Sequence, residues 1–196
     1  MARAFFFITH PNVVISRDIP VPQWPLSDLG RARMHAGLAQ PWVPEITSIY
    51  CSTERKAIDS AQILAQHLSI TYREIAELGE NDRSSTGFLD PQEFERVADE
   101  FFAKPGGSVR GWERAVDAQG RILRAVTAIA ANDRSSGSIA IIAHGAVGTL
   151  LYCHLAGVPI SRQWDQPANG GGNFFRFTLQ PAGVQSWWKP IDGPAL

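Results

Sequence analysis

The chain has 196 residues, of which 44% are hydrophobic and 19% are charged, and its formal net charge is −1. This size and composition are typical of one globular domain with a full core. The small net charge disfavours a general nucleic-acid surface, which would carry a basic excess. The apolar run at residues 5–8 is too short for a signal sequence or a membrane span, and Cys51 and Cys153 lack metal-type or redox-type spacing. We therefore expect a cytoplasmic protein with two reduced thiols and no nucleic-acid or membrane partner.

Short apolar or β-branched runs alternate with helical patterns along the chain. Strands are predicted at residues 4–9, 46–51, 71–75, 138–143, 173–179 and 184–189. Helices are predicted at residues 27–38, 53–68, 91–102, 112–131 and 146–155, the first three with Ser27, Thr53 and Asp90 as caps. This alternation predicts an α/β fold of three layers: a mostly parallel sheet of about six strands between helices, with one antiparallel edge strand or hairpin at its end.

Residues 1–196 contain no repeat and no composition break, so we expect a single domain. Residues 81–111 are less regular and contain the runs Ser84-Ser85-Thr86-Gly87 and Lys104-Pro105-Gly106-Gly107-Ser108. Irregular segments of this kind concentrate at functional edges of α/β sheets. We therefore expect residues 81–111 to form an insertion or lid over the active edge.

Two histidines follow predicted strands directly: His10 after residues 4–9 and His144 after residues 138–143. Open α/β sheets place their sites at the carboxyl ends of strands. The two imidazoles can therefore meet if their strands are neighbours in a parallel sheet. His35, His67 and His154 fall within helical patterns, where a core or surface role is expected.

Five motifs in order resemble the histidine phosphatase superfamily, which includes the cofactor-dependent phosphoglycerate mutases. Thr9-His10-Pro11 stands where that family has Arg-His-Gly, and Pro25–Ala32 (PLSDLGRA) matches its first helix start. The later matches are Cys51–Ala61 (CSTERKAIDSA), Leu78-Gly79-Glu80 and His144-Gly145. The ordered set spans residues 4 to about 157, which makes it far more specific than any single motif.

The resemblance implies a phosphoryl-transfer site that needs neither metal nor cofactor. His10 would be the nucleophile, and His144 would donate to the transferring phosphoryl oxygens. Glu80 would protonate the leaving alcohol and then activate water, with Asp82 as the competing candidate. Gly145, beside His144, and Thr9, beside His10, are expected at the phosphate site.

The cationic positions depart from the family pattern. Thr9 replaces an arginine, and Pro11 replaces a glycine whose N–H would be available to phosphate. Lys56 aligns with the family's second arginine, while Arg55 is one place earlier; helix neighbours point about 100° apart, so only one is expected to face phosphate. Ser16 is near the family's asparagine position, and Arg17 is the favoured replacement cation.

Other arginines, Arg83, Arg110 and Arg114, are alternatives to Arg17. The leading hypothesis is a metal-independent phosphomonoester hydrolase acting through phospho-His10, favoured over a mutase. Its expected partner is a phosphorylated small molecule, and a homodimer is left open. The alternative is a phosphatase-like binding or regulatory module with weak or no turnover, although Glu80 has no purpose in pure binding. A histidine metal site has little support because the ligand spacing is wrong.

Overall fold

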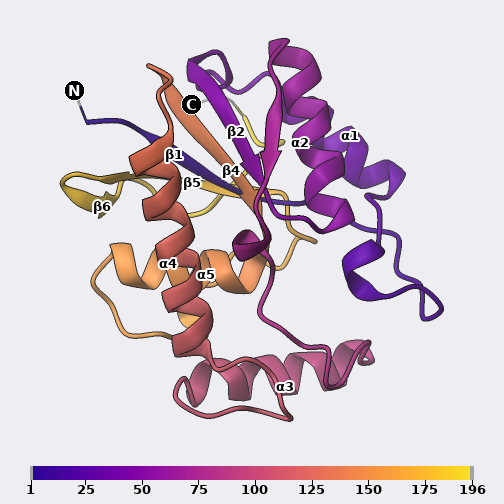
Figure 1. The fold of residues 1–196 in the computed structure, drawn as a ribbon. Coiled ribbons are helices and arrows are strands. Elements are labelled where there is room, and N and C mark those ends of the chain that lie inside the picture. Colours follow the sequence, from indigo (N-terminus) through magenta and orange to yellow (C-terminus); the bar gives the residue numbers. More distant parts are fainter. Residues whose placement is uncertain (1, 195–196) are drawn as a thin grey trace.

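The computed structural model describes residues 2–194, which form a seven-stranded mixed sheet with helices on both faces (Figure 1). The strands are β1 (Phe5–Thr9), β2 (Ile46–Cys51), β3 (Tyr72–Glu74), β4 (Ser138–Ala143), β5 (Asn173–Leu179), β6 (Ala182–Val184) and β7 (Lys189–Pro190). The α-helices are α1 (Asp28–Gly37), α2 (Arg55–Leu68), α3 (Pro91–Ala103), α4 (Ala115–Asn132) and α5 (Gly145–Leu155). The α/β class and the mostly parallel sheet are thus confirmed.

The sheet order is β3-β2-β4-β1-β5-β6, so β4 lies between β2 and β1. The contacts among β1, β2, β3 and β4 are parallel, whereas β5 is antiparallel to β1. The strand expected at residues 184–189 is instead two short strands, β6 and β7. Both pair with β5, β6 at its end and β7 at its start, because the chain turns back along the same edge of β5.

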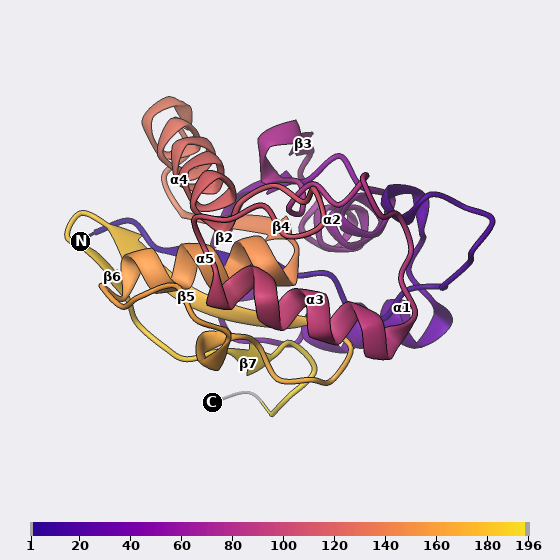
Figure 2. The same ribbon diagram turned by 90° about the horizontal axis from the view of Figure 1, so that it is seen from below.

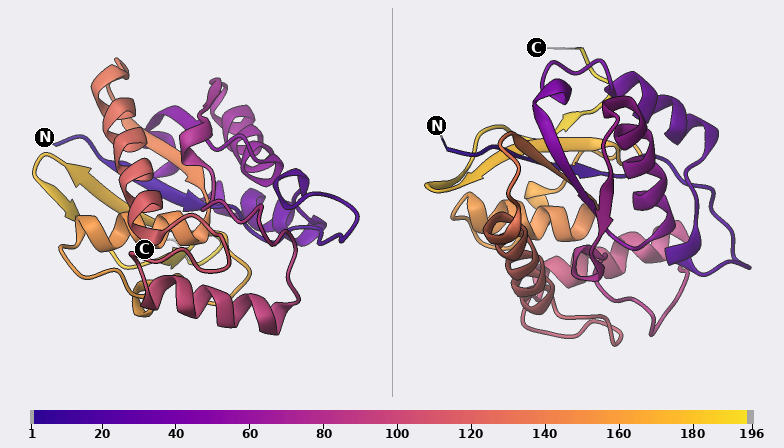
Figure 3. Two further views of the ribbon diagram at one scale, coloured as in Figure 1. Left: turned by 60° about the horizontal axis from the view of Figure 1, so that its bottom comes forward. Right: turned by 45° about the horizontal axis from the view of Figure 1, so that its top comes forward.

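Side chains of β1 alternate between two cores, as the period of two in a strand requires. Phe5 and Phe7 pack with α4 and α5, while Phe6 and Ile8 pack with α1 and α2. Both views in Figure 3 show α1 and α2 on one side of the sheet and α4 and α5 on the other. The two cores hold the sheet rigidly between helices, so residues at the strand ends have fixed positions.

The helix starts differ in detail from expectation. Ser27 caps α1, its side chain accepting from the Gly30 N–H at 3.1 Å, as predicted. The helix expected from Thr53 begins two residues later, at Arg55, with Glu54 as the N-cap residue. The delay follows from Ser52, whose Oγ accepts from the Glu54 N–H at 3.2 Å and keeps the chain out of the helix there.

The segment of residues 81–111 contains loops and α3. In Figure 1 the arrowheads of β1, β2 and β4 point toward the centre of the molecule, and α3 lies beyond them at the bottom of the view. Figure 2, seen from that side, shows α3 across the front. This placement agrees with an element over the active edge, and its role as a lid stays a prediction. No helix within residues 2–194 is long and apolar enough to cross a membrane.

Candidate active site

The structure brings His10 and His144 together at the carboxyl ends of neighbouring strands. Their strands pair in parallel with Thr9 opposite Ala143, so the next residue of each strand faces the same edge. The ring centroids are 5.2 Å apart and the ring planes meet at 67°. The two histidines predicted to meet therefore form one site.

The imidazole of His10 is held as a neutral base. Its Nδ1 lies 3.0 Å from the carbonyl oxygen of Pro11, which can only accept, so Nδ1 carries the proton and Nε2 keeps a free lone pair. Burial, reinforced by the nearby Lys56 charge, lowers the pKa of His10 to about 4. A neutral nitrogen with a free lone pair is the form that attacks phosphorus.

The main chain of His10 is fixed by a glycine run that the sequence reasoning missed. The Gly172 N–H donates to the His10 carbonyl at 3.0 Å, and a Cβ on Gly171 would lie 2.2 Å from the same oxygen. Gly170, Gly171 and Gly172 all have positive φ, a conformation that favours glycine. Three consecutive glycines directly before β5 were the available signal.

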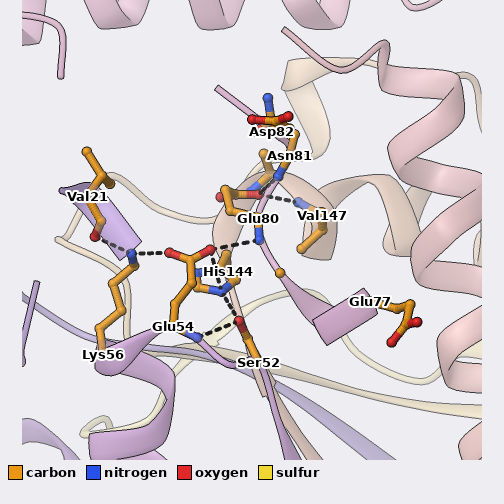
Figure 4. Close-up of polar contacts among 12 residues, drawn as sticks. Val21, Ser52, Glu54, Lys56, Glu77, Glu80, Asn81, Asp82, His144 and Val147 are labelled. Atoms are coloured by element: carbon orange, nitrogen blue, oxygen red, sulfur yellow. Dashed lines mark hydrogen bonds and ion pairs between the residues drawn. The ribbon is translucent and has the colours of Figure 1, made fainter. Parts of the chain in front are cut away.

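His144 is fully buried and is held by the turn that follows β2. Its Nε2 lies 2.8 Å from Ser52 Oγ and 3.3 Å from Glu54 Oε1 (Figure 4). Burial lowers the pKa of His144 well below its usual value, although the Glu54 charge opposes this. Ser52 and Glu54 were not predicted as site residues, yet they lie within the Cys51–Ala61 motif at the end of the strand next to β4.

Lys56 and Arg55 differ in burial, since the side chain of Lys56 is buried and that of Arg55 is largely exposed. Lys56 is buried, and its Nζ contacts the Glu54 carboxylate and donates to the Val21 carbonyl at 3.0 Å (Figure 4). Arg55 is largely exposed and pairs at 2.7 Å with Asp59, a buried residue one turn further along α2. Of the two alternatives, Lys56 is therefore the cation beside the histidines.

Glu80 lies at the N-terminus of α5. Its carboxylate accepts from the backbone N–H groups of Ala146 at 3.1 Å and Val147 at 3.0 Å, next to His144 (Figure 4). Burial raises the pKa of Glu80, while Arg83 and the backbone donors work against this. A carboxyl group that is more easily protonated suits a general acid.

Asp82 fits that role less well. It is exposed, and hydrogen bonding from Ser84, whose N–H donates to Asp82 Oδ1 at 2.8 Å, lowers the pKa of Asp82. The comparison between the two carboxyl groups therefore favours Glu80.

Three other predicted phosphate contacts have polar partners within the protein. Thr9 is buried and donates from Oγ1 to Gln166 at 2.7 Å. Arg17 is exposed, pairs with Asp90 and lies over the ring of Phe88. Ser16 Oγ accepts from the Asp18 N–H at 3.3 Å. Their roles in phosphate binding stay predictions, as does that of Gly145, the first residue of α5.

The arginine alternatives separate clearly. Arg110 pairs with Glu93 and Arg114 with Asp117, both at the surface. Arg83 lies over the rings of Phe94 and Trp112, and its charge influences the pKa values of His10, His144 and Glu80. Of these three arginines, Arg83 is therefore the one whose charge acts on the histidines, and its role in phosphate binding stays a prediction. No cluster of three or more His, Cys, Asp or Glu side chains suited to a metal ion occurs within residues 2–194.

Comparisons with solved structures find the same fold in several proteins. A mycobacterial glucosyl-3-phosphoglycerate phosphatase, solved with inorganic phosphate, has a TM-score of 0.78 at 19% identity, covering 98% of this chain and 100% of that chain. YhfR of Bacillus stearothermophilus has a TM-score of 0.74 at 22% identity, covering 94% of this chain and 95% of that one. The α-ribazole phosphatase of Shigella flexneri has a TM-score of 0.70 at 15% identity, with 98% of each chain covered.

Identities this low show a shared fold alone. No curated protein matches the sequence. The family model of the histidine phosphatase superfamily (branch 1) matches residues 17–187, a region that begins after His10 and includes Lys56, Glu80 and His144. This match spans most of the 196 residues, and the chain belongs to the histidine phosphatase superfamily.

Proposed function

We propose that this protein is a metal-independent phosphomonoesterase that works through a phosphohistidine on His10. The observation that carries the proposal is the neutral His10, which keeps a free lone pair on Nε2 and whose ring lies beside that of His144 at the edge of the sheet. Lys56 and Arg83 supply positive charge to this position. Phosphoryl transfer requires such a nucleophile together with charge that stabilises the equatorial oxygens.

The reaction has two steps. The Nε2 lone pair of His10 attacks phosphorus, the bond from phosphorus to the leaving oxygen breaks, and Glu80 gives that oxygen its proton. In the second step Glu80 removes a proton from water, the water oxygen attacks phosphorus, and the phosphorus–nitrogen bond breaks. Inorganic phosphate leaves, and His10 returns to its neutral form with Nδ1–H still donating to Pro11.

A phosphorylated small molecule is the proposed substrate. Two structural neighbours are named as a glucosyl-3-phosphoglycerate phosphatase and an α-ribazole phosphatase. Glucosyl-3-phosphoglycerate and the phosphate ester of α-ribazole therefore belong in a substrate panel with p-nitrophenyl phosphate. A phosphatase is favoured over a mutase because Thr9 and Lys56 replace both arginines that the mutases retain.

The second candidate function, phosphate binding with weak or no turnover, has one specific observation in its favour. The Glu54 carboxylate pairs with Lys56 and offsets part of the positive charge of the site. Phosphate binding without hydrolysis across the panel would support this alternative.

The deciding experiment compares His10→Ala with His35→Ala, a control at an exposed histidine of α1. We expect hydrolysis to fall to background in His10→Ala and to persist in His35→Ala and in excess chelator. A quenched reaction with labelled substrate should leave an acid-labile, alkali-stable phosphate on the wild type. Hydrolysis that survives His10→Ala would overturn the mechanism.

A further inference from the structure

The carboxylate of Glu54 joins three parts of the site (Figure 4). One oxygen, Oε1, approaches Nε2 of His144 and accepts from the backbone N–H of Glu80 at 3.1 Å, while the other contacts Nζ of Lys56. Burial works against the charged form, but His144, Lys56 and the Glu80 N–H outweigh it and lower the pKa of Glu54 to about 2. Glu54 is therefore a fixed negative charge within the site.

This negative charge determines which ring nitrogen of His144 holds the proton. An ionised carboxylate can only accept, so Nε2 at 3.3 Å is the protonated nitrogen, shared between Glu54 and Ser52 Oγ at 2.8 Å. The other nitrogen, Nδ1, is buried and has no hydrogen-bond partner within residues 2–194. In neutral His144, Nδ1 is thus a lone pair without a donor.

A lone pair cannot bind a phosphoryl oxygen, since both groups are acceptors. His144 becomes a donor at Nδ1 only by taking up a proton, which makes the ring an imidazolium with both nitrogens protonated. Burial opposes that charge, and so do the nearby cations. Glu54 favours it, as would a bound dianion. The charged or titratable groups around His144 are Glu54, Lys56, His10, Arg83 and Glu80.

We propose that Glu54 is a positioning residue that makes His144 a proton-coupled anion receptor. Anion binding draws one proton from solvent onto Nδ1, and Glu54 is the counter-ion of the imidazolium. When the anion leaves, the proton returns to solvent. This inference rests on the proposed function in one respect: the phosphoryl group is taken to bind at the two histidines.

The test uses the wild-type protein with ¹⁵N-labelled histidine and sulfate, which stays a dianion between pH 6 and 8. The ¹⁵N signals of His144 report directly which ring nitrogens are protonated. We expect Nδ1 to be unprotonated without sulfate and protonated at saturating sulfate. In the pH range in which the free ring is neutral and the sulfate-bound ring is charged, sulfate affinity should fall about tenfold for each unit of rising pH, because binding takes up one proton.

Two matched variants separate charge from structure. Glu54→Gln keeps the size and one acceptor oxygen but has no charge, so sulfate should bind at least about tenfold more weakly, with no proton uptake. Glu77→Gln makes the same change at an exposed residue that points away from His144 in Figure 4, and its affinity should equal that of the wild type.

Three outcomes would overturn the proposal. They are protonated Nδ1 in the free protein, no protonation of His144 at any sulfate concentration, and tighter sulfate binding by Glu54→Gln, which would make Glu54 a simple repulsive charge. If Glu54→Gln does not fold, the wild-type titration still decides. Because the readout needs no turnover, failure of the phosphatase hypothesis would appear only in the His10→Ala assay.

Discussion

Replacing Lys56 with methionine should destabilise the protein far more than the same replacement at its neighbour Arg55. The Lys56 side chain is 5% exposed and is held by the Val21 carbonyl and the Glu54 carboxylate. Removal of its charge leaves Glu54 in a confined site with no cationic partner. Loss of one member of a buried ion pair destabilises by about 3–5 kcal/mol.

The lower end of that range applies here, because Glu54 is 13% exposed and keeps the N–H of Glu80 as a donor. A loss of about 3 kcal/mol in a chain of this size lowers the melting temperature by roughly 6–12 °C. Arg55 is 59% exposed, and its buried partner Asp59 keeps Arg31 and the backbone N–H of Leu26 as donors when Arg55 is replaced. Arg55→Met should therefore lose less than about 1 kcal/mol.

Urea unfolding gives the stability of both variants, and hydrolysis of p-nitrophenyl phosphate gives their activity. We expect kcat/KM to fall about 10²-fold to 10³-fold in Lys56→Met, as for removal of one oxyanion donor, and to change little in Arg55→Met. Adding Glu54→Leu to Lys56→Met should restore most of the stability, since it removes the unpaired charge, but not the activity. An activity loss in Arg55→Met equal to that in Lys56→Met would refute the placement of phosphate beside Lys56.

Three other changes test the site by independent routes. Because the pKa of His10 is lowered to about 4 in the folded protein, its unfolded form takes up a proton first as the pH falls. The free energy of unfolding, measured by urea titration, should therefore decrease as the pH falls from 6.5 to 4. This decrease should be smaller in His10→Asn. If the variant shows the same pH dependence as the wild type, His10 is not a buried neutral group. Glu80→Gln should lower the rate of hydrolysis of an alkyl phosphate by about 10²-fold to 10⁴-fold. The rate with p-nitrophenyl phosphate should fall much less, because nitrophenolate leaves without a proton. Equal losses with the two substrates would argue against Glu80 as the acid. Gly171→Ala brings a Cβ to 2.2 Å from the His10 carbonyl oxygen and should lower the melting temperature. Gly87→Ala should lower it less, because φ is also positive at Gly87 but no atom lies near the added Cβ. Equal melting temperatures would show that the loop around Gly171 moves away freely.

The sequence was sufficient for features that depend on local pattern. The apolar runs that end at Thr9 and Ala143 identify two strands, and the histidine after each run is at a strand end. The alternation of strands and helices predicts that those strands are parallel, and the resemblance to the histidine phosphatase motifs implies that both histidines belong to one site. For these reasons the α/β fold and the meeting of His10 with His144 could be predicted.

The partners of charged side chains could not be predicted, because they depend on residues far away in the chain. Arg17 lies in the loop after His10, but its partner Asp90 is 73 positions away. Ser52 and His144 are 92 positions apart. Glu54 directly precedes a helix, and an acidic residue there is explained by its favourable interaction with the helix dipole. The sequence therefore gives no reason to assign Glu54 to the site. The contacts of Ser52 and Glu54 with His144 arise only because β2 packs beside β4.

The central position of β4 has a consequence for how the protein forms. β1 and β2 each pair with β4 and not with one another. One edge of each strand therefore lacks a partner until residues 138–143 pair with both. During synthesis these edges of β1 and β2 stay unpaired until β4 has been made, and unpaired strand edges promote aggregation. The same insertion brings His144 to His10. A truncated chain that ends before β4 would therefore lack the histidine pair and expose two unpaired strand edges, so it should be both inactive and prone to aggregate.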